Sequence, residues 1–165
     1  MPPKMNVAEY FMKRLLFAAA LIAFVSPTSA QDIAKTTIVK PDAVAWKDAP
    51  SLPKGAQFVI LMGDPTKPGA MVVQRLKLPP NYQIPAHTHP HVVIETVLTG
   101  SMGFGMGEKL DTQKGDMLKP GSLLMMPPGH AHYVWTGNEE TIFQLQTIGP
   151  IGIDYLNPAD DPRKK

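Results

Sequence analysis

The chain has 165 residues, enough for one domain, and a formal net charge of +2. Beyond residue 30 the 13 basic side chains are balanced by 13 acidic ones, so the body lacks the positive surface that binds nucleic acid, and we expect no such partner. The absence of cysteine excludes disulfides and leaves histidine, carboxylate and methionine as candidate metal ligands.

Residues 12–30 have the layout of a secretory signal peptide. Two basic residues, an 11-residue apolar run and a small-residue cleavage site follow one another. The apolar run is too short to span a bilayer, which takes roughly 20 residues. We therefore predict translation from Met12, a leader over residues 1–30 that includes a signal-peptide helix, and cleavage after Ala30. The mature protein is expected to be periplasmic or secreted, with no membrane partner.

The rest of the chain is predicted to form short β-strands separated by proline and glycine. Residues 31–56 are polar and rich in proline, and we predict an N-terminal arm there with an edge strand at Thr36–Val39. Residues 57–156 carry strands at a spacing typical of a sandwich or barrel. These are Gln57–Met62, Ala70–Leu78, His91–Thr99, Ser101–Met106, Ser122–Met126, His132–Thr136, Thr141–Ile148 and Ile151–Leu156. Residues 157–165 are predicted to be a polar, solvated tail. The sequence therefore predicts an all-β domain.

Glycine alternates through residues 100–107, GSMGFGMG. A nucleotide-binding loop needs a different glycine spacing and a helix after it. Alternating glycine within a strand marks instead a close approach of another group to the backbone, or a bend. We favour the strand interpretation and expect no nucleotide.

All five histidines fall into two clusters, His87, His89 and His91, then His130 and His132. Residues two apart in a strand share a face, so His87 and His89 present two imidazoles toward one point, and a suitable fold brings His132 to the same point. Three convergent imidazoles form a site for one divalent metal ion, with Zn, Fe, Mn, Ni and Cu not distinguished. The alternative is a set of surface or turn histidines, which we favour for His91 and His130.

The second histidine cluster resembles the second sequence motif of the cupin family, G-x5-P-x-G-x2-H-x3-N. The matching residues are Gly121, Pro127, Gly129 and His132, and Thr136 stands in place of the asparagine. His87-Thr88-His89 resembles the start of the first motif, H-x-H-x3–4-E-x6-G. The resemblance extends over residues 57–156. It implies a double-stranded β-helix, or jelly-roll, barrel with the metal in its mouth, and a homodimer, since cupins are often dimers.

One position departs from the cupin pattern. The ligand glutamate of the first motif would stand at residue 93, where this chain has Val93, and Glu95 follows two residues later. Glu95 shares the strand parity of Val93 and should point inward, ~6.6 Å further along at ~3.3 Å per residue. A one-residue bulge would change that position but would also turn the side chain to the other face. Three roles stay open: fourth metal ligand, acid/base or hydrogen-bonding group beside the metal, or outward carboxylate.

Three neutral imidazoles leave a divalent metal with its full charge and with open positions, which is typical of catalytic sites. Within the cupins, such sites resemble those of thiol and aromatic-ring dioxygenases, which implies oxygenation of a small anionic substrate at iron. Two other functions stay open. One is metal-assisted isomerase, lyase or hydrolytic chemistry with Glu95 as base, and the other is non-catalytic binding of a small molecule or of the metal.

Three further polar side chains bear on this choice. Gln144 and Gln146 alternate with apolar neighbours, so both line the barrel or both face solvent. An inward Gln144 together with an inward Glu95 would favour proton-transfer chemistry. Tyr133 faces away from His132, and we predict core packing for it rather than catalysis.

Overall fold

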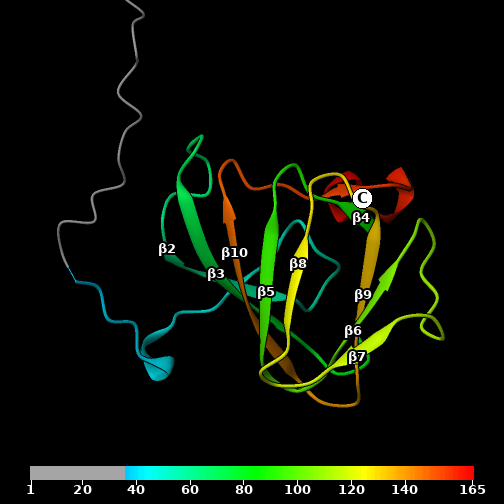
Figure 1. Ribbon diagram of the computed structural model, residues 1–165, viewed down its shortest axis with the longest axis horizontal. Coiled ribbons are helices and arrows are strands. Elements are labelled where there is room, and N and C mark those ends of the chain that lie inside the picture. The colour runs from blue at the N-terminus through cyan, green and yellow to red at the C-terminus, as the bar shows by residue number, and fades with distance from the viewer. Residues whose placement is uncertain (1–35) are drawn as a thin grey trace, which may run out of the picture.

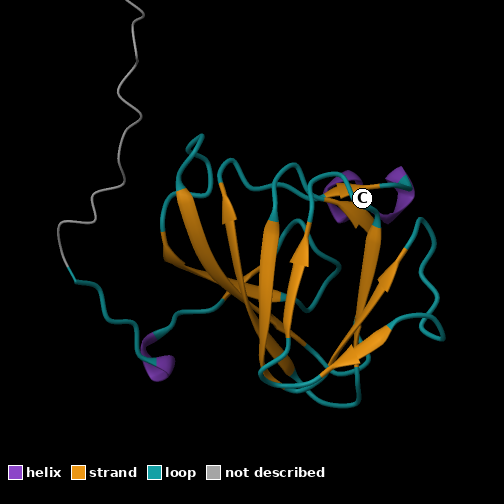
Figure 2. Ribbon diagram, viewed as in Figure 1, coloured by secondary structure: helices purple, strands orange, loops and turns teal. Residues whose placement is uncertain are grey.

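The computed structural model describes residues 36–165, and the predicted leader, signal-peptide helix and cleavage site lie outside them. Two antiparallel sheets face each other (Figure 1). Loops connect the strands, and of the three short 3-10 helices in the described residues one precedes the first strand and two follow the last (Figure 2). The six-stranded sheet has the order β1-β2-β3-β10-β5-β8, and the five-stranded sheet has the order β11-β4-β9-β6-β7. None of the described helices is long and apolar enough to cross a membrane.

The strand bounds are as follows: β1 Lys47–Asp48, β2 Gln57–Met62, β3 Met71–Leu78, β4 Gln83–Thr88, β5 Val93–Thr99, β6 Met102–Met106, β7 Asp116–Leu118, β8 Leu123–Met126, β9 His132–Thr136, β10 Thr141–Ile148 and β11 Asp154–Tyr155. Burial alternates along β3 and β10, with every second side chain buried. This period of two is expected of strands that cover a core with one face. The buried apolar side chains of both sheets meet in one cluster between them. The prediction of an all-β, two-sheet jelly-roll barrel is confirmed.

The strand predictions differ from the structure at both ends of the barrel. No strand forms at Thr36–Val39; those residues are exposed, and the first strand to find a partner is β1, which pairs with β2. Two strands, β4 and the short β7, were not predicted from the sequence. In β4, Pro85 stands where a run of β-branched residues would have indicated a strand. Within the predicted Ile151–Leu156, only Asp154–Tyr155 is a strand.

Segments on either side of the predicted barrel also pack against it. Ala49 and Leu52, within the predicted arm, belong to the buried apolar cluster. In the predicted tail, Asp161 is buried and its carboxylate accepts hydrogen bonds from the Arg163 guanidinium at 2.7 and 2.9 Å. The expectation of a fully solvated tail is therefore wrong at Asp161, because the arginine supplies the partner that a buried carboxylate needs.

The alternating glycines of β6 are explained by aromatic rings of β9. Gly103 pairs with Trp135 and Gly105 with Tyr133. A Cβ atom at Gly103 would lie 1.9 Å from the Trp135 indole, and one at Gly105 would lie 2.3 Å from the Tyr133 ring. The two rings stack with their centroids 5.9 Å apart. The predicted close approach is confirmed, and it lets bulky rings lie flat on the outer face of the five-stranded sheet.

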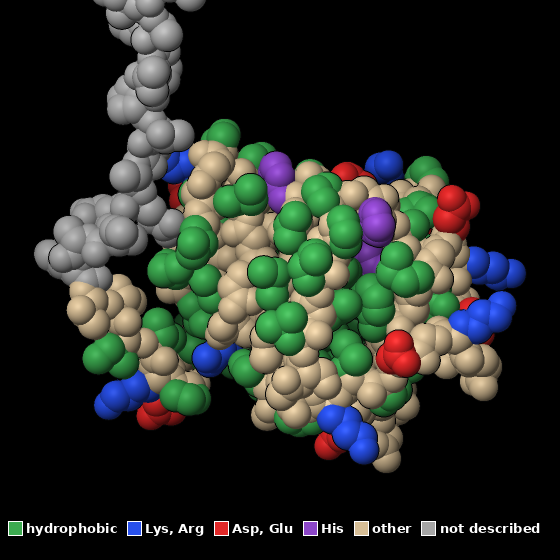
Figure 3. All heavy atoms as spheres, in the orientation of Figure 1, with side chains coloured by type: hydrophobic (Ala, Val, Ile, Leu, Met, Phe, Trp, Pro, Cys, Tyr) green, Lys and Arg blue, Asp and Glu red, His purple; other side chains and the backbone are tan. Residues whose placement is uncertain are grey.

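The outer face of the six-stranded sheet is apolar near its β8 edge. Figure 3 shows hydrophobic side chains gathered over β5 and β8. They include Ile94 and Leu98 of β5, and Leu123 and Met125 of β8, all exposed. An antiparallel sheet usually presents polar residues to water on its outer face, so this surface departs from the usual pattern.

Candidate metal centre

A β-bulge in β4 aims His87 into the barrel. Ile84 pairs with Val134, and His87 pairs with His132, so β4 has one residue more than β9 between these two pairs. Proline has no N–H to donate to a ladder, and Pro85 lies within the interruption. A one-residue bulge reverses the face of the residues that follow it. His87 therefore points to the same side as the core residue Ile84.

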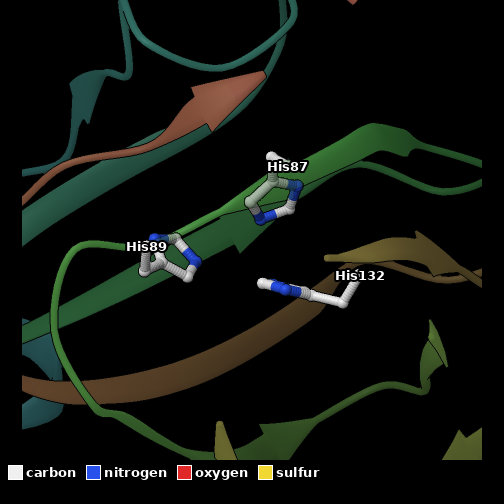
Figure 4. Close-up of side chains that lie close together, drawn as sticks. All are labelled: His87, His89 and His132. Atoms are coloured by element: carbon white, nitrogen blue, oxygen red, sulfur yellow. The ribbon is translucent and has the colours of Figure 1, made fainter. Parts of the chain in front are cut away.

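The fold brings His87, His89 and His132 together, as the sequence predicted (Figure 4). One candidate ligand nitrogen from each lies within 4.8 Å of the other two. The ring centroids are 4.2 Å apart for His87 and His132, 5.0 Å for His87 and His89, and 5.2 Å for His89 and His132. His87 and His132 are almost fully buried, and His89 lies just past the end of β4.

Hydrogen bonds to the backbone orient all three rings. The Nδ1 atom of His87 lies 2.7 Å from the Pro85 carbonyl oxygen, that of His89 2.7 Å from the Gly152 oxygen, and that of His132 2.9 Å from the His130 oxygen. A carbonyl oxygen only accepts, so each Nδ1 carries the proton and donates it. The lone pair of each neutral ring is then on Nε2. Such fixed tautomers are typical of histidines that bind metals.

The surroundings keep these imidazoles neutral. Burial lowers the pKa of His132 to about 4. Burial is also the main cause that holds the pKa of His87 well below its usual range, and the neighbouring His132 and His89 add to the effect. The pKa of His89 is lowered as well, again mainly by burial. Neutral imidazoles with free Nε2 atoms are the donor set that divalent Zn, Fe, Mn, Ni and Cu ions bind, so the residues fit one such ion.

A cavity of about 250 Å³ lies beside the histidines, between the two sheets. His87 and His89 line one part of it. Most other lining side chains are apolar, among them Phe58, Leu76, Ile84, Val93, Val134, Phe143 and Leu145. His91 also lines the cavity but is outside the three-histidine group, and His130 is exposed. The site can therefore hold a small, largely apolar molecule next to a metal ion.

Glu95 faces this cavity from β5. Pairing is regular from Val93 with Met126 to Glu95 with Leu124, so no bulge shifts Glu95 relative to Val93. The side chain is buried, and its Oε2 atom has no hydrogen-bond partner among the described residues. Burial raises the pKa of Glu95 to about 8. The inward orientation follows the strand parity, and an outward carboxylate is wrong.

The geometry favours one of the two remaining roles of Glu95. Its carboxyl is not part of the group of ligand atoms within 4.8 Å, which among the described residues consists of the three histidines. Val93, at the position of the usual ligand glutamate, is a buried apolar side chain of the cavity wall. The structure thus supports an acid/base or hydrogen-bonding role for Glu95 over direct ligation.

The other polar candidates face away from the cavity. Phe143 and Leu145 line it, so Gln144 and Gln146 lie on the outer face of β10, where the Gln144 Oε1 atom accepts a hydrogen bond from Arg75 Nε at 3.2 Å. Tyr133 is buried on the outer face of the five-stranded sheet, and its hydroxyl donates to backbone carbonyl oxygens of the loop after β6. It therefore packs, as expected, although outside the cluster between the two sheets.

Sequence reasoning missed one cavity residue, Gln74 of β3, which is buried and faces Glu95 across Leu145. The signal was available, because Gln74 has the parity of the buried apolar residues Val72 and Leu76. A polar side chain on the apolar face of a strand is a candidate site residue.

No family model and no curated protein matches the sequence, but solved structures match the fold. The polyketide cyclase RemF from Streptomyces resistomycificus matches with a TM-score of 0.63 and 22% identity, over 79% of this chain and 92% of that chain. An RmlC-like cupin from Shewanella frigidimarina matches with a TM-score of 0.53 and 12% identity, over 69% and 91%. The DMSP lyase DddQ from Ruegeria pomeroyi matches with a TM-score of 0.52 and 19% identity, over 66% and 57%.

The likeness to these structures is one of fold, and it agrees with the motif resemblance in the sequence. The histidines of both motifs meet at one end of a two-sheet barrel, beside its internal cavity. The chain therefore has the double-stranded β-helix fold of the cupin superfamily.

Proposed function

We propose that this protein is a metal-dependent enzyme that moves a proton on a small, largely apolar substrate, in a lyase, isomerase or cyclase type of reaction. The observation that carries the proposal is the buried Glu95 carboxyl, which lies in the cavity that His87 and His89 line and whose Oε2 atom has no hydrogen-bond partner in residues 36–165. A carboxyl with a raised pKa in a cleft is typical of general acids and bases. With a pKa of about 8, Glu95 can release and recover a proton near neutral pH.

The chain's residues have separate roles in this proposal. His87, His89 and His132 would hold the metal ion through Nε2, and the ion, when bound, supplies Lewis acidity to a substrate oxygen. The Glu95 carboxyl exchanges a proton with the substrate. The apolar wall keeps water away from both groups, which strengthens their electrostatic effect. Two solved structures of this fold are named as a cyclase and a lyase.

The test uses hydroxyacetone, an α-hydroxy ketone whose two oxygens can bind one metal ion and whose C–H protons exchange slowly. Protein loaded with Zn²⁺ or Mn²⁺ is incubated with it in D₂O under nitrogen, and exchange is followed by proton NMR. We expect metal-dependent exchange with the wild type. Glu95→Gln should bind the metal normally and lose the exchange. Equal exchange by both proteins would contradict the role of Glu95.

Oxygenation at iron is the second candidate function, and the neutral donor set favours it. Three imidazoles bring no negative charge to the metal, so an anionic substrate would supply it. This function predicts oxygen uptake by the Fe²⁺-loaded protein, little effect of Glu95→Gln, and no exchange with Zn²⁺. Stoichiometric metal binding with neither activity would instead support the third candidate, a non-catalytic small-molecule or metal-binding protein.

We also propose that the protein acts outside the cytoplasm. The support is the order of basic, apolar and small residues over residues 12–30. Export and cleavage after Ala30 predict that the mature protein from its native host begins at Gln31. N-terminal sequencing that finds Met1 or Met12 would contradict this proposal and leave the metal site unaffected.

A further inference from the structure

The cavity has a second polar region, on the six-stranded sheet, whereas the strands that position the histidines belong to the five-stranded one. Gln74 of β3 pairs with Leu145 of β10, and Leu145 pairs with Glu95 of β5. The three residues therefore form one row across the six-stranded sheet, and all three side chains line the cavity. Neighbouring strands lie about 4.8 Å apart, so the Cα atoms of Gln74 and Glu95 are about 10 Å apart. Two side chains of this length can approach one small group over Leu145 from both sides.

This polar pair lies in apolar surroundings. Gln74 is 9% exposed and Glu95 is 5% exposed, while Leu76, Phe143 and Leu145 line the cavity around them. A buried polar group without a hydrogen bond destabilises the fold by roughly 1–3 kcal/mol, and Glu95 Oε2 has no partner among residues 36–165. A buried polar atom without a partner calls for an explanation, such as a catalytic role or a bound group, and the Glu95 atom lies at a cavity that can hold one. Leucine at residue 95 would pack here without this cost.

The charges around the cavity select the kind of ligand group. Besides its histidines, the described cavity lining contains one cationic side chain, Arg163. Its guanidinium already donates to Asp161 and, at 3.0 Å, to the Ile153 carbonyl oxygen. An anionic ligand group beside the Glu95 carboxyl would therefore have to compete with Asp161 for the Arg163 guanidinium, and its desolvation would be poorly compensated. An uncharged hydroxyl or carbonyl can bond to both an amide and a carboxyl.

We propose that Gln74 and Glu95 form a specificity subsite for an uncharged oxygen group of the substrate: Glu95 exchanges its proton with the substrate between the metal-binding group and this oxygen, and Gln74 binds the oxygen itself. This inference rests on the proposed metal site. Strand β5 begins at Val93, just after the loop that carries His89, and runs away from that loop. Glu95 lies ~6.6 Å further along this strand than Val93. The substrate class is thus a small compound with a metal-binding oxygen group at one end, a short apolar body, and a hydroxyl or carbonyl several ångströms away. Gln74 is the residue that distinguishes this substrate from a purely apolar one.

The test uses four short hydroxamic acids, which bind divalent metals through two oxygens and differ only at the far end. They are butanohydroxamic acid, its 4-hydroxy and 4-amino derivatives, and the monohydroxamic acid of succinic acid. Their affinities are measured by calorimetry with Zn²⁺-loaded protein. We expect the hydroxyl-ended probe to bind about tenfold more tightly than the apolar one, and the carboxylate-ended probe to bind more weakly. The proposal would be overturned if the carboxylate-ended or amine-ended probe bound most tightly, or if all four probes bound with equal affinity.

Gln74→Leu should remove the preference for the hydroxyl-ended probe and leave the affinity for the apolar probe within about twofold. Gln74→Ala serves as a second variant if leucine does not fit, and thermal melting checks the fold of both. The matched control is Gln144→Leu, the same change on the outer face, where Gln144 contacts Arg75; it should keep the preference. A preference that survives Gln74→Leu would overturn the subsite.

Titration with Zn²⁺ alone, in the same proteins, separates this inference from the metal site on which it rests. A protein that binds Zn²⁺ stoichiometrically but shows no preference among the probes contradicts the subsite alone. A protein that binds no Zn²⁺ contradicts the metal site, and with it the subsite. Glu95→Gln keeps a hydrogen-bonding side chain, so it should retain the probe preference although it loses proton exchange.

Discussion

The two walls of the cavity differ in how their polar groups are held. On the side of the five-stranded sheet, each histidine of the metal group donates its Nδ1 proton to a backbone carbonyl oxygen. On the six-stranded sheet, the Oε2 atom of Glu95 has no hydrogen-bond partner within the described part of the chain. The imidazole rings of the first wall are therefore held in their orientation before a metal binds, while the carboxyl of the second wall can still accept a hydrogen bond from a ligand. Changes to one wall should therefore leave the function of the other largely intact.

The largest expected effect is the loss of one histidine from the oriented wall. His87→Ala or His132→Ala should weaken Zn²⁺ binding by more than about 100-fold, because even the loss of an outer partner of a metal ligand costs 10–100-fold. His91→Ala is the matched control, since His91 lines the cavity but lies outside the group. Calorimetric titration measures both. An empty site in His91→Ala and a full one in His87→Ala would show that the ligands are assigned wrongly.

The pH dependence of metal binding comes next. Imidazoles must be neutral to bind, and a free histidine has a pKa of roughly 6.5. Burial lowers the pKa of His132 to about 4 and that of His87 well below its usual range. Protons therefore compete at a lower pH than they would at free histidines, and the affinity should begin to fall only at a pH clearly below 6.5. Competition with a chelator of known pH dependence measures it, with circular dichroism to check the fold. A decline that already begins near pH 6.5 would contradict the lowered pKa values.

A change on the outer face of the five-stranded sheet tests how rigidly that wall is held. Gly103→Ala should lower the free energy of unfolding by about 1–3 kcal/mol, because its Cβ would collide with the Trp135 ring. Denaturant titration measures the loss. In a protein that already carries Trp135→Leu, the space beside Gly103 is free. Gly103→Ala should therefore cost less stability there than it does in the wild type. Full stability of Gly103→Ala would mean that the ring is not confined.

The smallest expected effect concerns Glu95 and the stability of the metal-free protein. Its pKa is about 8 in the folded protein and about 4.3 in an unfolded chain, so unfolding releases a proton between these values. Stability should fall as the pH rises from 6.5 to 8, with a slope of at most ~1.4 kcal/mol per pH unit. The histidines, whose lowered pKa values act below pH 6.5, do not interfere in this range. Glu95→Gln should lack this slope, and parallel profiles of the two proteins would contradict a buried, protonated Glu95.

Much of the candidate site could be predicted from local patterns. The H-x-H spacing identified His87 and His89, and the glycine and proline positions of the second motif identified His132. Strand parity predicted the inward orientation of Glu95, and the alternation of glycines predicted the close contact with β9. These predictions succeeded because a strand has a period of two, which is a local property of the backbone.

Other features depend on contacts between distant residues. The bulge near Pro85 is defined by pairing with β9, so the sequence of β4 alone does not reveal it. The strand predicted at Thr36–Val39 failed for the same reason, since an edge strand exists only where a partner offers free backbone groups. The burial of Asp161 likewise depends on where Arg163 and the Ile153 carbonyl lie.

The sequence by itself determined the class of fold, the three histidines and the carboxyl beside them, because residue type and strand period are local properties. Only the tertiary structure decided what these groups can do. It showed that the histidine nitrogens converge, that Glu95 is outside their group, and that Gln74 faces it across Leu145. Burial, pKa and cavity shape arise from packing among strands far apart in the chain, and no single segment carries that information.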